Sequence, residues 1–465
     1  MTSESTIEIN FDHGTLLVTA DPEQISPVID LLKYDQRVKL FRAQGYVYAQ
    51  LIRQLISAGI SFIDHAKNFT PLELTLKSRL TPRVHQAEAL KCWLADKGRG
   101  TVVMPTGSGK TFMAAMAMAT IKRPTLVLAP TIDLMQQWTS VLERLFGIEA
   151  GMLGGGSHNI LPVTVSTYDS AVLNMEFIGN RFGLIIFDEC HHLPGTMNRM
   201  AATMCIAPWR LGLTATPERS DGGEIILEEL VGPQVYRIDI DQLEGNVLAP
   251  YRTVRLELPL DPDEAAEYQV AHRIYREFLQ RNQFSFNNQK DWSRFVGLCA
   301  RSPEGRCAFD AYLKQRRIAR GGHAKIRKTW ELIRRHRHER IIIFTAENET
   351  AYRLGESFLM PVITHLTKAA ERKEMLDRFR SGDYPVLITS KVLNEGVDVP
   401  EAGVGIIVSG SGSIREHVQR LGRILRAGNG KKAVLYELVS QGTSEISVSR
   451  RRREHRAYQR GRRNY

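Results

Sequence analysis

The chain has 465 residues, more than one domain usually holds, so two or three domains with separate cores are expected. Hydrophobic residues at 43% and charged residues at 24% are ordinary for a globular protein, and the polar N-terminus predicts neither a signal peptide nor a membrane span. Five cysteines without a C-x-x-C pair argue against a disulfide framework and a zinc ribbon, so a cytoplasmic protein with reduced thiols is expected.

The formal net charge of +11 is concentrated in two stretches. Residues 450–465 contain eight Arg and one Glu, which gives +7, and residues 316–340 contain ten Lys or Arg and two Glu, which gives +8. The rest of the chain therefore carries a net charge of −4. This distribution favours contact with a polyanion, and a solvated helix face with a loose tail is the alternative interpretation.

The first segment, to about residue 75, begins with a hairpin pattern. Apolar residues alternate between Ile7 and Val18 around the turn candidate Asp12-His13-Gly14. Apolar residues then recur at helical spacing from Tyr46 to Leu55, and Gly59 is the expected stop. We expect a small α+β domain without catalytic residues.

From Arg83 onward, short strands that are apolar on both faces alternate with helices, as in parallel sheets covered by helices on each side. The expected strands of a first unit are Thr101–Met104, Thr125–Ala129, Val163–Ser166, Leu184–Phe187 and Leu211–Leu213. Those of a second unit are Ile341–Phe344, Val386–Thr389, Gly405–Val408 and Ala433–Tyr436. The stretch from Asp261 to about Arg320, between the two units, is charged and predicted to be helical.

The first chemical signal runs from Met104 to Thr111, MPTGSGKT, after an expected strand and at the start of an Ala-rich helix. Glycines let the backbone curl around phosphates, Lys110 can reach the β and γ oxygens, and Thr111 can ligate Mg²⁺. The strict pattern has Gly where Met104 stands. The sequence predicts a phosphate cradle, and a Gly-rich turn with an incidental Lys is the alternative.

The second signal is a buried strand that ends in two acids, Asp188 and Glu189. Such a pair can hold Mg²⁺ through the first carboxylate and polarise an attacking water through the second. A zinc site of Cys190, His191, His192 and Cys205 is the alternative, but the first three are consecutive and do not easily converge on one ion.

The third signal lies in the second unit, where Arg420, Arg423 and Arg426 follow one another at a spacing of three. This spacing puts them on one helix face, and planar guanidinium groups stabilise phosphoryl transfer. An Arg-rich amphipathic helix is the alternative, which the cradle and the acid pair make less favourable.

These three motifs, in this order, resemble a superfamily 2 DExH helicase, and nearly the whole chain resembles the XPB family, especially its archaeal and bacterial members. The resemblance implies an α/β fold of two RecA-like parallel-sheet domains in tandem, with a small N-terminal α+β domain and a helical thumb-like insertion. The implied domains are a damage-recognition-like domain at 1–75, an ATP-binding RecA-like domain at 76–245, a connector and thumb at 246–320, a second RecA-like domain at 321–448 and an Arg-rich tail at 449–465.

The resemblance also assigns the site residues, motif by motif. The implied catalytic residues are Lys110, Asp188, Glu189, Gln419, Arg423 and Arg426. The implied ATP-binding residues are Arg83, Gln86, Thr106, Gly107, Ser108, Gly109, Lys110, Thr111, Gly396 and Asp398, with Thr111 and Asp188 on Mg²⁺. The residues implied in coupling or in DNA binding are Thr131, Thr167, His191, Thr214, Thr216, Arg219, Asp221, Thr345 and Thr389.

The implied function is ATP-dependent movement on DNA, or its unwinding, with 3′ to 5′ polarity and a role in DNA repair. ATP and Mg²⁺ are the implied cofactors, and single-stranded or forked DNA is the implied partner. The core ATPase is expected to be a monomer that acts at the nucleoid. The family has an Arg-Glu-Asp element, implicated in strand separation, where this chain has Arg219-Ser220-Asp221. Because this Glu is missing, a double-stranded DNA translocase that does not separate strands is an alternative function. Such a translocase could serve a nuclease partner. An RNA helicase and a binding protein with a relic ATP site are further alternatives.

Overall fold

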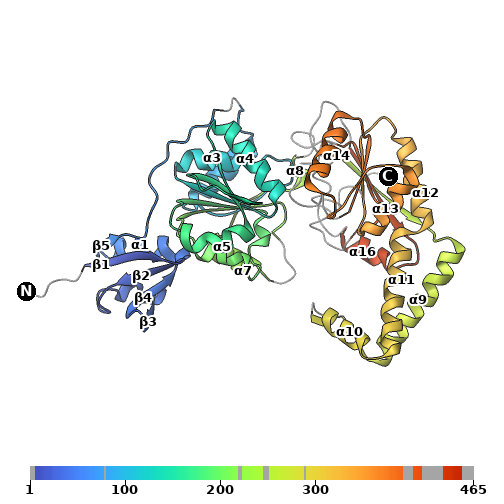
Figure 1. The fold of residues 1–465 in the computed structure, drawn as a ribbon, viewed down its shortest axis with the longest axis horizontal. Helices are drawn as coiled ribbons and strands as arrows, with labels where there is room; N and C mark the ends of the chain where they lie inside the picture. The colour runs from blue at the N-terminus through green and yellow to red at the C-terminus, as the bar shows by residue number, and fades with distance from the viewer. Residues whose placement is uncertain are drawn as a thin grey trace, which may run out of the picture. The chain divides into compact units, whose positions relative to one another are not determined.

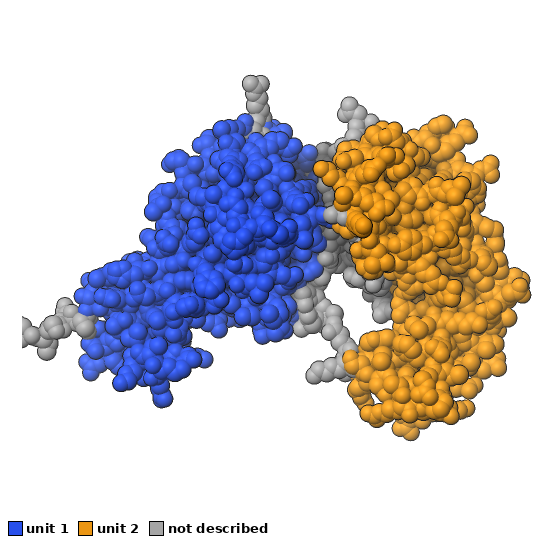
Figure 2. Space-filling view, in the orientation of Figure 1, with its two compact units in different colours: residues 1–243, 395–398 blue, residues 244–394, 399–465 orange. Residues whose placement is uncertain are grey.

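The computed structural model describes residues 6–77, 80–217, 222–243, 251–286, 290–390, 402–410 and 433–452. The chain divides into two compact units (Figure 2). The first contains residues Met1–Leu243, and the second contains most of the chain from Glu244 onward. Among the helices within these described ranges, none is long and apolar enough to cross a membrane.

The N-terminal module is a five-stranded sheet in the order β3-β4-β2-β1-β5, with helix α1 beside it (Figure 1). The first hairpin is confirmed, because His13 and Gly14 turn the chain with positive φ of 46° and 80°. Ile9 and Leu16 of the hairpin are buried in one cluster with Leu51 of α1. The elements are β1 (Ile7–Asp12), β2 (Thr15–Thr19), a 3-10 helix (Ser26–Leu31), β3 (Lys33–Asp35), β4 (Leu40–Gln44), a 3-10 helix (Gly45–Val47), α1 (Tyr48–Ser57) and β5 (Phe62–Asp64).

The larger sheet of the first unit has the order β13-β6-β12-β11-β7-β10-β8-β9, with only β8 and β9 antiparallel among its described pairs. Its strands are β6 (Arg99–Val103), β7 (Thr125–Ala129), β8 (Gly151–Gly154), β9 (Ser157–His158), β10 (Val163–Thr167), β11 (Leu184–Asp188), β12 (Trp209–Thr214) and β13 (Gln234–Arg237). Its helices are α2 (Val84–Ala95), α3 (Lys110–Ile121), α4 (Ile132–Phe146), α5 (Tyr168–Ile178), α6 (Asn198–Thr203), α7 (Glu224–Leu230) and α8 (Ile240–Leu243), with a 3-10 helix at Cys190–His192.

Helices cover both faces of this sheet, with α3 and α4 on one side and α5 and α7 on the other (Figure 1). Neighbouring residues of β7 show that apolar side chains on both faces of the sheet are buried by helices. Val127 packs in the cluster that contains residues of α3 and α4, whereas Leu126 and Leu128 pack in the cluster that contains residues of α5 and α7. The strands are therefore apolar on both faces, as the sequence predicts.

The second unit contains a six-stranded parallel sheet in the order β14-β19-β18-β15-β17-β16. Its strands are β14 (Tyr251–Leu258), β15 (Ile341–Phe344), β16 (Val362–Ile363), β17 (Val386–Thr389), β18 (Val404–Ile407) and β19 (Ala433–Ser440). Apart from the insertion described below, the described helices that lie between or after these strands in the chain are α12 (His323–Arg335), α13 (Asn348–Phe358), α14 (Ala369–Ser381) and α16 (Glu445–Arg452). The fold is thus the expected one, with two parallel-sheet units and a small α+β module.

The helical insertion of the second unit consists of α9 (Pro262–Arg281), α10 (Lys290–Ala300) and α11 (Pro303–Gly321), and it extends away from the sheet of that unit (Figure 1). Its core is aromatic, with neighbouring ring centroids between 5.1 and 6.4 Å apart. Phe286 and Trp292 remain partly exposed at its surface. The rings of the cluster are those of Tyr275, Phe284, Phe286, Trp292, Phe295, Phe309 and Tyr312.

Candidate active site

The loop between β6 and α3 is shaped to surround a phosphate group. Gly107 and Gly109 have φ of 84° and 88°, values that side-chain-bearing residues rarely adopt. Ser108 is fully buried, and its hydroxyl donates to the Pro105 carbonyl at 2.7 Å. The Lys110 ammonium donates to the Met104 carbonyl at 3.1 Å, across the loop. The loop thus presents the lysine and the N-terminus of a 12-residue helix, α3, to one position.

The start of α2 braces this loop from outside. The Gln86 amide accepts a hydrogen bond from the Arg83 backbone N–H at 2.9 Å and donates to the Ser108 carbonyl at 3.1 Å. A Cβ atom at Gly109 would lie 2.2 Å from Gln86 Nε2, so the glycine is also required by this contact. The ring of His85, which the sequence analysis missed, lies 2.9 Å from the same Ser108 carbonyl through Nε2. No motif signals this histidine.

Strand β11 delivers Asp188 to the carboxyl edge of the sheet. Its Oδ2 accepts a hydrogen bond from Trp138 Nε1 at 2.7 Å, and its Oδ1 accepts one from the backbone N–H of Glu189 at 3.0 Å. The Tyr168 hydroxyl donates to the Asp188 backbone carbonyl at 3.0 Å. Glu189 has φ of 46°, a strained left-handed value that a functional site can impose. Trp138 lies seven residues after Thr131, and Tyr168 directly follows Thr167. Thr131 and Thr167 were expected near DNA, but the bonds of Trp138 and Tyr168 to Asp188 were not predicted.

The environment of Asp188 suits a bound cation. Burial and then the negative charge of Glu189 raise the pKa of Asp188 to about 6, while the Trp138 hydrogen bond and the positive charge of Lys110 act in the opposite direction. A buried carboxyl group with a raised pKa gains most from a cation that neutralises it. Oxygen donors such as the Asp188 carboxylate and the Thr111 hydroxyl are those that Mg²⁺ prefers, so these residues fit the expected ion.

A buried polar chain leads from the acid pair to the next strand. His191 Nδ1 lies 3.4 Å from a Glu189 carboxylate oxygen and 3.0 Å from Thr214 Oγ1. Thr214 Oγ1 also accepts a hydrogen bond from the backbone N–H of Thr216 at 3.1 Å. His191, Thr214 and Thr216 are all buried. The structure therefore brings together His191, Thr214 and Thr216, three of the residues expected in coupling or in DNA binding.

Thr131 and Thr167, expected near DNA, begin helices at the carboxyl ends of β7 and β10. Thr131 Oγ1 accepts from the Leu134 N–H at 3.3 Å, and Thr167 Oγ1 accepts from the Ser170 N–H at 3.2 Å. These strands are neighbours, with Thr167 paired to Ala129. Both hydroxyls are thus engaged as helix caps, so the adjacent backbone is the part of these motifs that is better suited to hold a phosphate.

Thr345 and Thr389 occupy the equivalent edge of the second sheet. The Thr345 backbone N–H donates to the Thr389 carbonyl at 2.9 Å, and both side chains are fully buried. The structure brings these two predicted residues together. Other predicted site residues lie outside the described residues, namely Arg219, Asp221, Gly396, Asp398, Gln419, Arg423 and Arg426.

The alternative zinc site is not favoured by the surroundings of its cysteines. Cys190 and Cys205 are fully buried in one hydrophobic cluster. Burial raises the pKa of both thiols, whereas a zinc ligand must be a thiolate. The same cluster contains Phe187 and Leu193, so the two cysteines are better explained as core residues.

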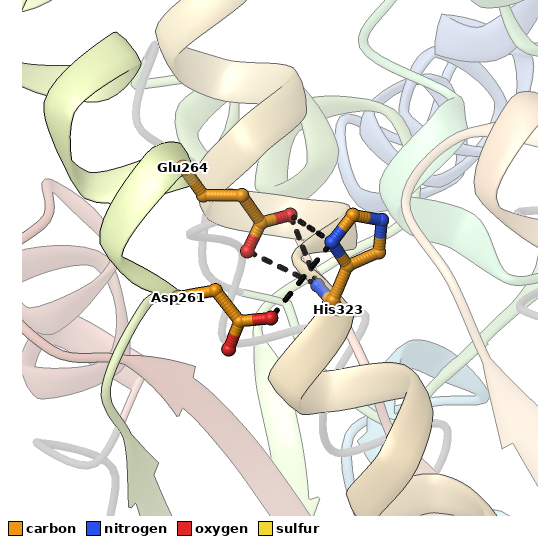
Figure 3. Close-up of side chains that lie close together, drawn as sticks. All are labelled: Asp261, Glu264 and His323. Carbon is orange, nitrogen blue, oxygen red and sulfur yellow. Dashed lines mark hydrogen bonds and ion pairs between the residues drawn. The ribbon is translucent and has the colours of Figure 1, made fainter.

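Within the described ranges, a different group has ligand atoms close enough together for a metal ion, namely Asp261, Glu264 and His323 (Figure 3). Its carboxylates already have partners, however. Arg327 binds both oxygens of Asp261, at 2.9 and 2.6 Å, and the backbone N–H of His323 donates to Glu264 at 3.0 Å. The group therefore joins the start of α9 to the N-terminus of α12, where an acid is favourable.

Comparison with known proteins covers most of the chain. Residues 9–66 match the family described as the Xeroderma pigmentosum group B helicase damage recognition domain, and residues 312–460 match the ERCC3/RAD25/XPB C-terminal helicase. Residues 79–219 match the Type III restriction enzyme, res subunit. The helicase domain of Hef from Pyrococcus furiosus has a similar fold, with a TM-score of 0.51, 20% identity and coverage of 79% of this chain and 97% of that one.

Two relatives place the chain more closely. The DNA 3'-5' translocase XPB2 of Sulfurisphaera tokodaii is 39% identical over 423 residues, which cover 91% of this chain and 96% of that protein. The DNA 3'-5' helicase XPB of Mycobacterium tuberculosis is 33% identical over 379 residues, which cover 78% of this chain and 61% of that protein. The chain belongs to the XPB family of superfamily 2 helicases.

Proposed function

We propose that this protein is an ATP-dependent 3′ to 5′ DNA translocase or helicase that acts in DNA repair. The observation that carries the proposal is the buried connection from Asp188 and Glu189, through His191, to Thr214. A site that only hydrolysed ATP would not need this connection, whereas a motor must transmit the state of its nucleotide to the neighbouring strand.

In the proposed ATPase site, the loop from Thr106 to Thr111 holds the phosphates, and Lys110 neutralises their charge. Mg²⁺, held by Thr111 and Asp188, would supply further positive charge to the transferred phosphoryl group. Glu189 would orient the attacking water. Support for these roles comes from the raised pKa of Asp188 and from the Lys110 hydrogen bond across the loop.

Three residues of the second unit would complete the site, namely Gln419, Arg423 and Arg426. Arginines from a second domain are a recurrent means of stabilising charge in phosphoryl transfer. If they contact ATP only when the two RecA-like domains close, binding favours the closed state and hydrolysis releases it. Gly396 and Asp398 would contact the same nucleotide, and Arg83 and Gln86 would contact its base. Alternating closure would move the chain along DNA.

Domain boundaries at 1–75, 76–245, 246–320, 321–448 and 449–465 remain our proposal. The proposed DNA contacts in the two RecA-like domains are the backbone near Thr131, Thr167, Thr345 and Thr389, together with Arg219 and Asp221. The helical insertion, with its partly exposed Phe286 and Trp292 and its basic helix α11, would contact single-stranded or forked DNA. We also propose that the core ATPase is a monomer and acts at the nucleoid.

Movement along duplex DNA without strand separation is the second candidate function. Ser220 stands where the family has a Glu in the element implicated in strand separation, and the relative from Sulfurisphaera tokodaii is named a translocase. A translocase of this kind could serve a nuclease partner. An RNA helicase is less favoured, since both relatives above are named for DNA.

One set of measurements separates these possibilities. ATP turnover is measured with single-stranded, forked, bubble and duplex DNA and with RNA, next to forked-duplex unwinding and triplex displacement. The proposal expects stronger stimulation by DNA than by RNA. Triplex displacement without fork unwinding would favour the translocase, and stimulation by RNA alone would overturn the DNA assignment.

A further inference from the structure

Trp138 makes a contact that core packing does not require. It is a buried residue of α4, 2% exposed, and its indole Nε1 donates to Asp188 Oδ2 at 2.7 Å. Asp188 Oδ1 accepts separately from the Glu189 N–H at 3.0 Å. The carboxylate is thus held by one donor at each oxygen, and its orientation depends on the position of α4.

The same helix begins at a motif proposed to contact DNA. Thr131 caps α4, and Trp138 follows seven residues later. Seven residues are two helical turns, so the two residues lie on the same face of α4, about 10 Å apart along its axis. Trp138 also packs in one cluster with Met113 of α3, the helix that starts with Lys110. A shift of α4 would therefore act on Asp188 and on the core cluster that includes Met113 of α3.

We propose that Trp138 is a positioning residue, which orients the Asp188 carboxylate toward the metal ion. Through the same contact, DNA binding at the start of α4 would change the position of that carboxylate. The inference rests on the proposed function. A hydrogen bond to a metal-ligating carboxylate fixes its orientation, and the loss of such a partner typically weakens metal binding about 10- to 100-fold. Movement of one helix that bears both contacts is a physical route by which DNA could stimulate ATP hydrolysis.

Trp93 provides a matched control. It is another fully buried tryptophan of the same core cluster, and its indole Nε1 donates to the Arg210 backbone carbonyl at 3.0 Å. Trp93→Phe and Trp138→Phe each remove one buried indole N–H and keep an aromatic ring. Only Trp138→Phe removes a donor from Asp188.

The test measures Mn²⁺ binding in the presence of ADP by electron paramagnetic resonance, with and without single-stranded DNA, for the full chain and both variants. Trp138→Phe should bind Mn²⁺ about 10- to 100-fold more weakly, while Trp93→Phe binds as the unsubstituted protein does. DNA should change Mn²⁺ affinity in the unsubstituted protein and in Trp93→Phe but not in Trp138→Phe. Equal affinities in the two variants would overturn the positioning role, and a DNA effect retained in Trp138→Phe would overturn the transmission role.

A second measurement covers the case in which Trp138→Phe does not fold. The chain has five tryptophans, so 5-fluorotryptophan labelling gives five ¹⁹F resonances. Single Phe variants of Trp93, Trp209, Trp292 and Trp330 assign four of them, which leaves Trp138. Its resonance should shift on addition of Mg²⁺ and ADP, and an unmoved resonance would overturn the inference. If the unsubstituted protein neither binds Mn²⁺ with ADP nor hydrolyses ATP with DNA, the proposed function itself fails.

Discussion

His191 Nδ1 lies 3.0 Å from Thr214 Oγ1, and this contact joins the 3-10 helix that follows β11 to the neighbouring strand β12. Both side chains are fully buried. Thr214 is also held by the backbone N–H of Thr216, so its hydroxyl cannot move without disturbing the segment that follows β12. Glu189 lies 3.4 Å from the same histidine nitrogen. A movement of the Glu189 side chain would therefore also displace the segment that follows β12.

The first prediction concerns this contact. Thr214→Val keeps the shape of the side chain and removes the hydroxyl, so ATP hydrolysis should continue while DNA movement per ATP falls by about 10-fold. The ratio of triplex displacement to phosphate release measures this coupling. Thr101→Val, at a buried position on neighbouring β6, is the control and should leave the ratio unchanged. Equal ratios for Thr214→Val and the unsubstituted protein would contradict the coupling role.

The raised pKa of Asp188 leads to a prediction of pH dependence. Folding raises this pKa from 3.8 to about 6, so the fold favours the protonated acid. That contribution to stability is present below the ordinary pKa and is lost as the pH rises through about 6. Binding of Mn²⁺ with ADP should therefore weaken by up to about tenfold per pH unit as the pH falls below about 6. Calorimetric affinities that stay constant between about pH 5 and pH 7 would contradict this assignment.

Arg210 supports a prediction about stability. Its buried guanidinium donates to the backbone carbonyls of Ala207 at 3.1 Å, Ala202 at 3.1 Å and Leu230 at 2.8 Å, and also to that of Cys205. Arg210→Met would leave these carbonyls without that donor and should lower the free energy of unfolding by about 3 kcal/mol or more.

Arg210→Lys should restore little of this loss, because an ammonium cannot reproduce the planar fork of five N–H donors. Denaturant unfolding of both variants measures the effect. Arg37→Met, at an exposed guanidinium, is the control and should leave the unfolding midpoint unchanged. A midpoint for Arg210→Met that equals that of the control would show that the buried guanidinium contributes nothing.

A buried ion pair gives a prediction for the second unit. Lys325 Nζ of α12 lies 2.5 Å from Glu445 Oε2 of α16, and it also donates to the Val408 carbonyl at 2.7 Å. Lys325→Met leaves the carboxylate buried without this partner and should cost about 3–5 kcal/mol.

Adding Glu445→Gln should recover part of that loss, because the amide oxygen can still accept the Ser440 N–H that now binds Glu445. A double-mutant cycle, measured by denaturant unfolding, tests the pair. A double variant that is less stable than Lys325→Met alone would contradict this account.

The sequence was most informative where structure depends on local pattern. Strands β7, β15 and β17 occupy the predicted residues. A short run that is apolar on both faces is stable mainly as a central strand of a sheet covered by helices on each side, so its position can be read from the sequence. Strand β18, at Val404–Ile407, begins and ends one residue before the predicted strand. Strand β14 was not predicted, since it carries Arg252, Arg255 and Glu257 and is defined by its pairing with β19 far along the chain.

The same distinction applies to the site. A continuous motif predicted the cradle around Lys110, because glycine placement and the helix start are encoded in adjacent residues. The contact of Trp138 with Asp188 joins residues 50 positions apart, and no spacing rule connects them. His85 was missed for the same reason, because its partner Ser108 lies 23 residues away.

The most direct test of the account is steady-state ATP hydrolysis, with and without single-stranded DNA, by the unsubstituted chain and by Lys110→Ala, Glu189→Gln and Arg423→Ala. We predict that DNA stimulates the unsubstituted chain, that each substitution lowers the stimulated rate by at least about 100-fold, and that DNA binding is largely retained. Unchanged turnover in Lys110→Ala or Glu189→Gln would contradict the site in the first unit. Unchanged turnover in Arg423→Ala would contradict the contribution of the second unit.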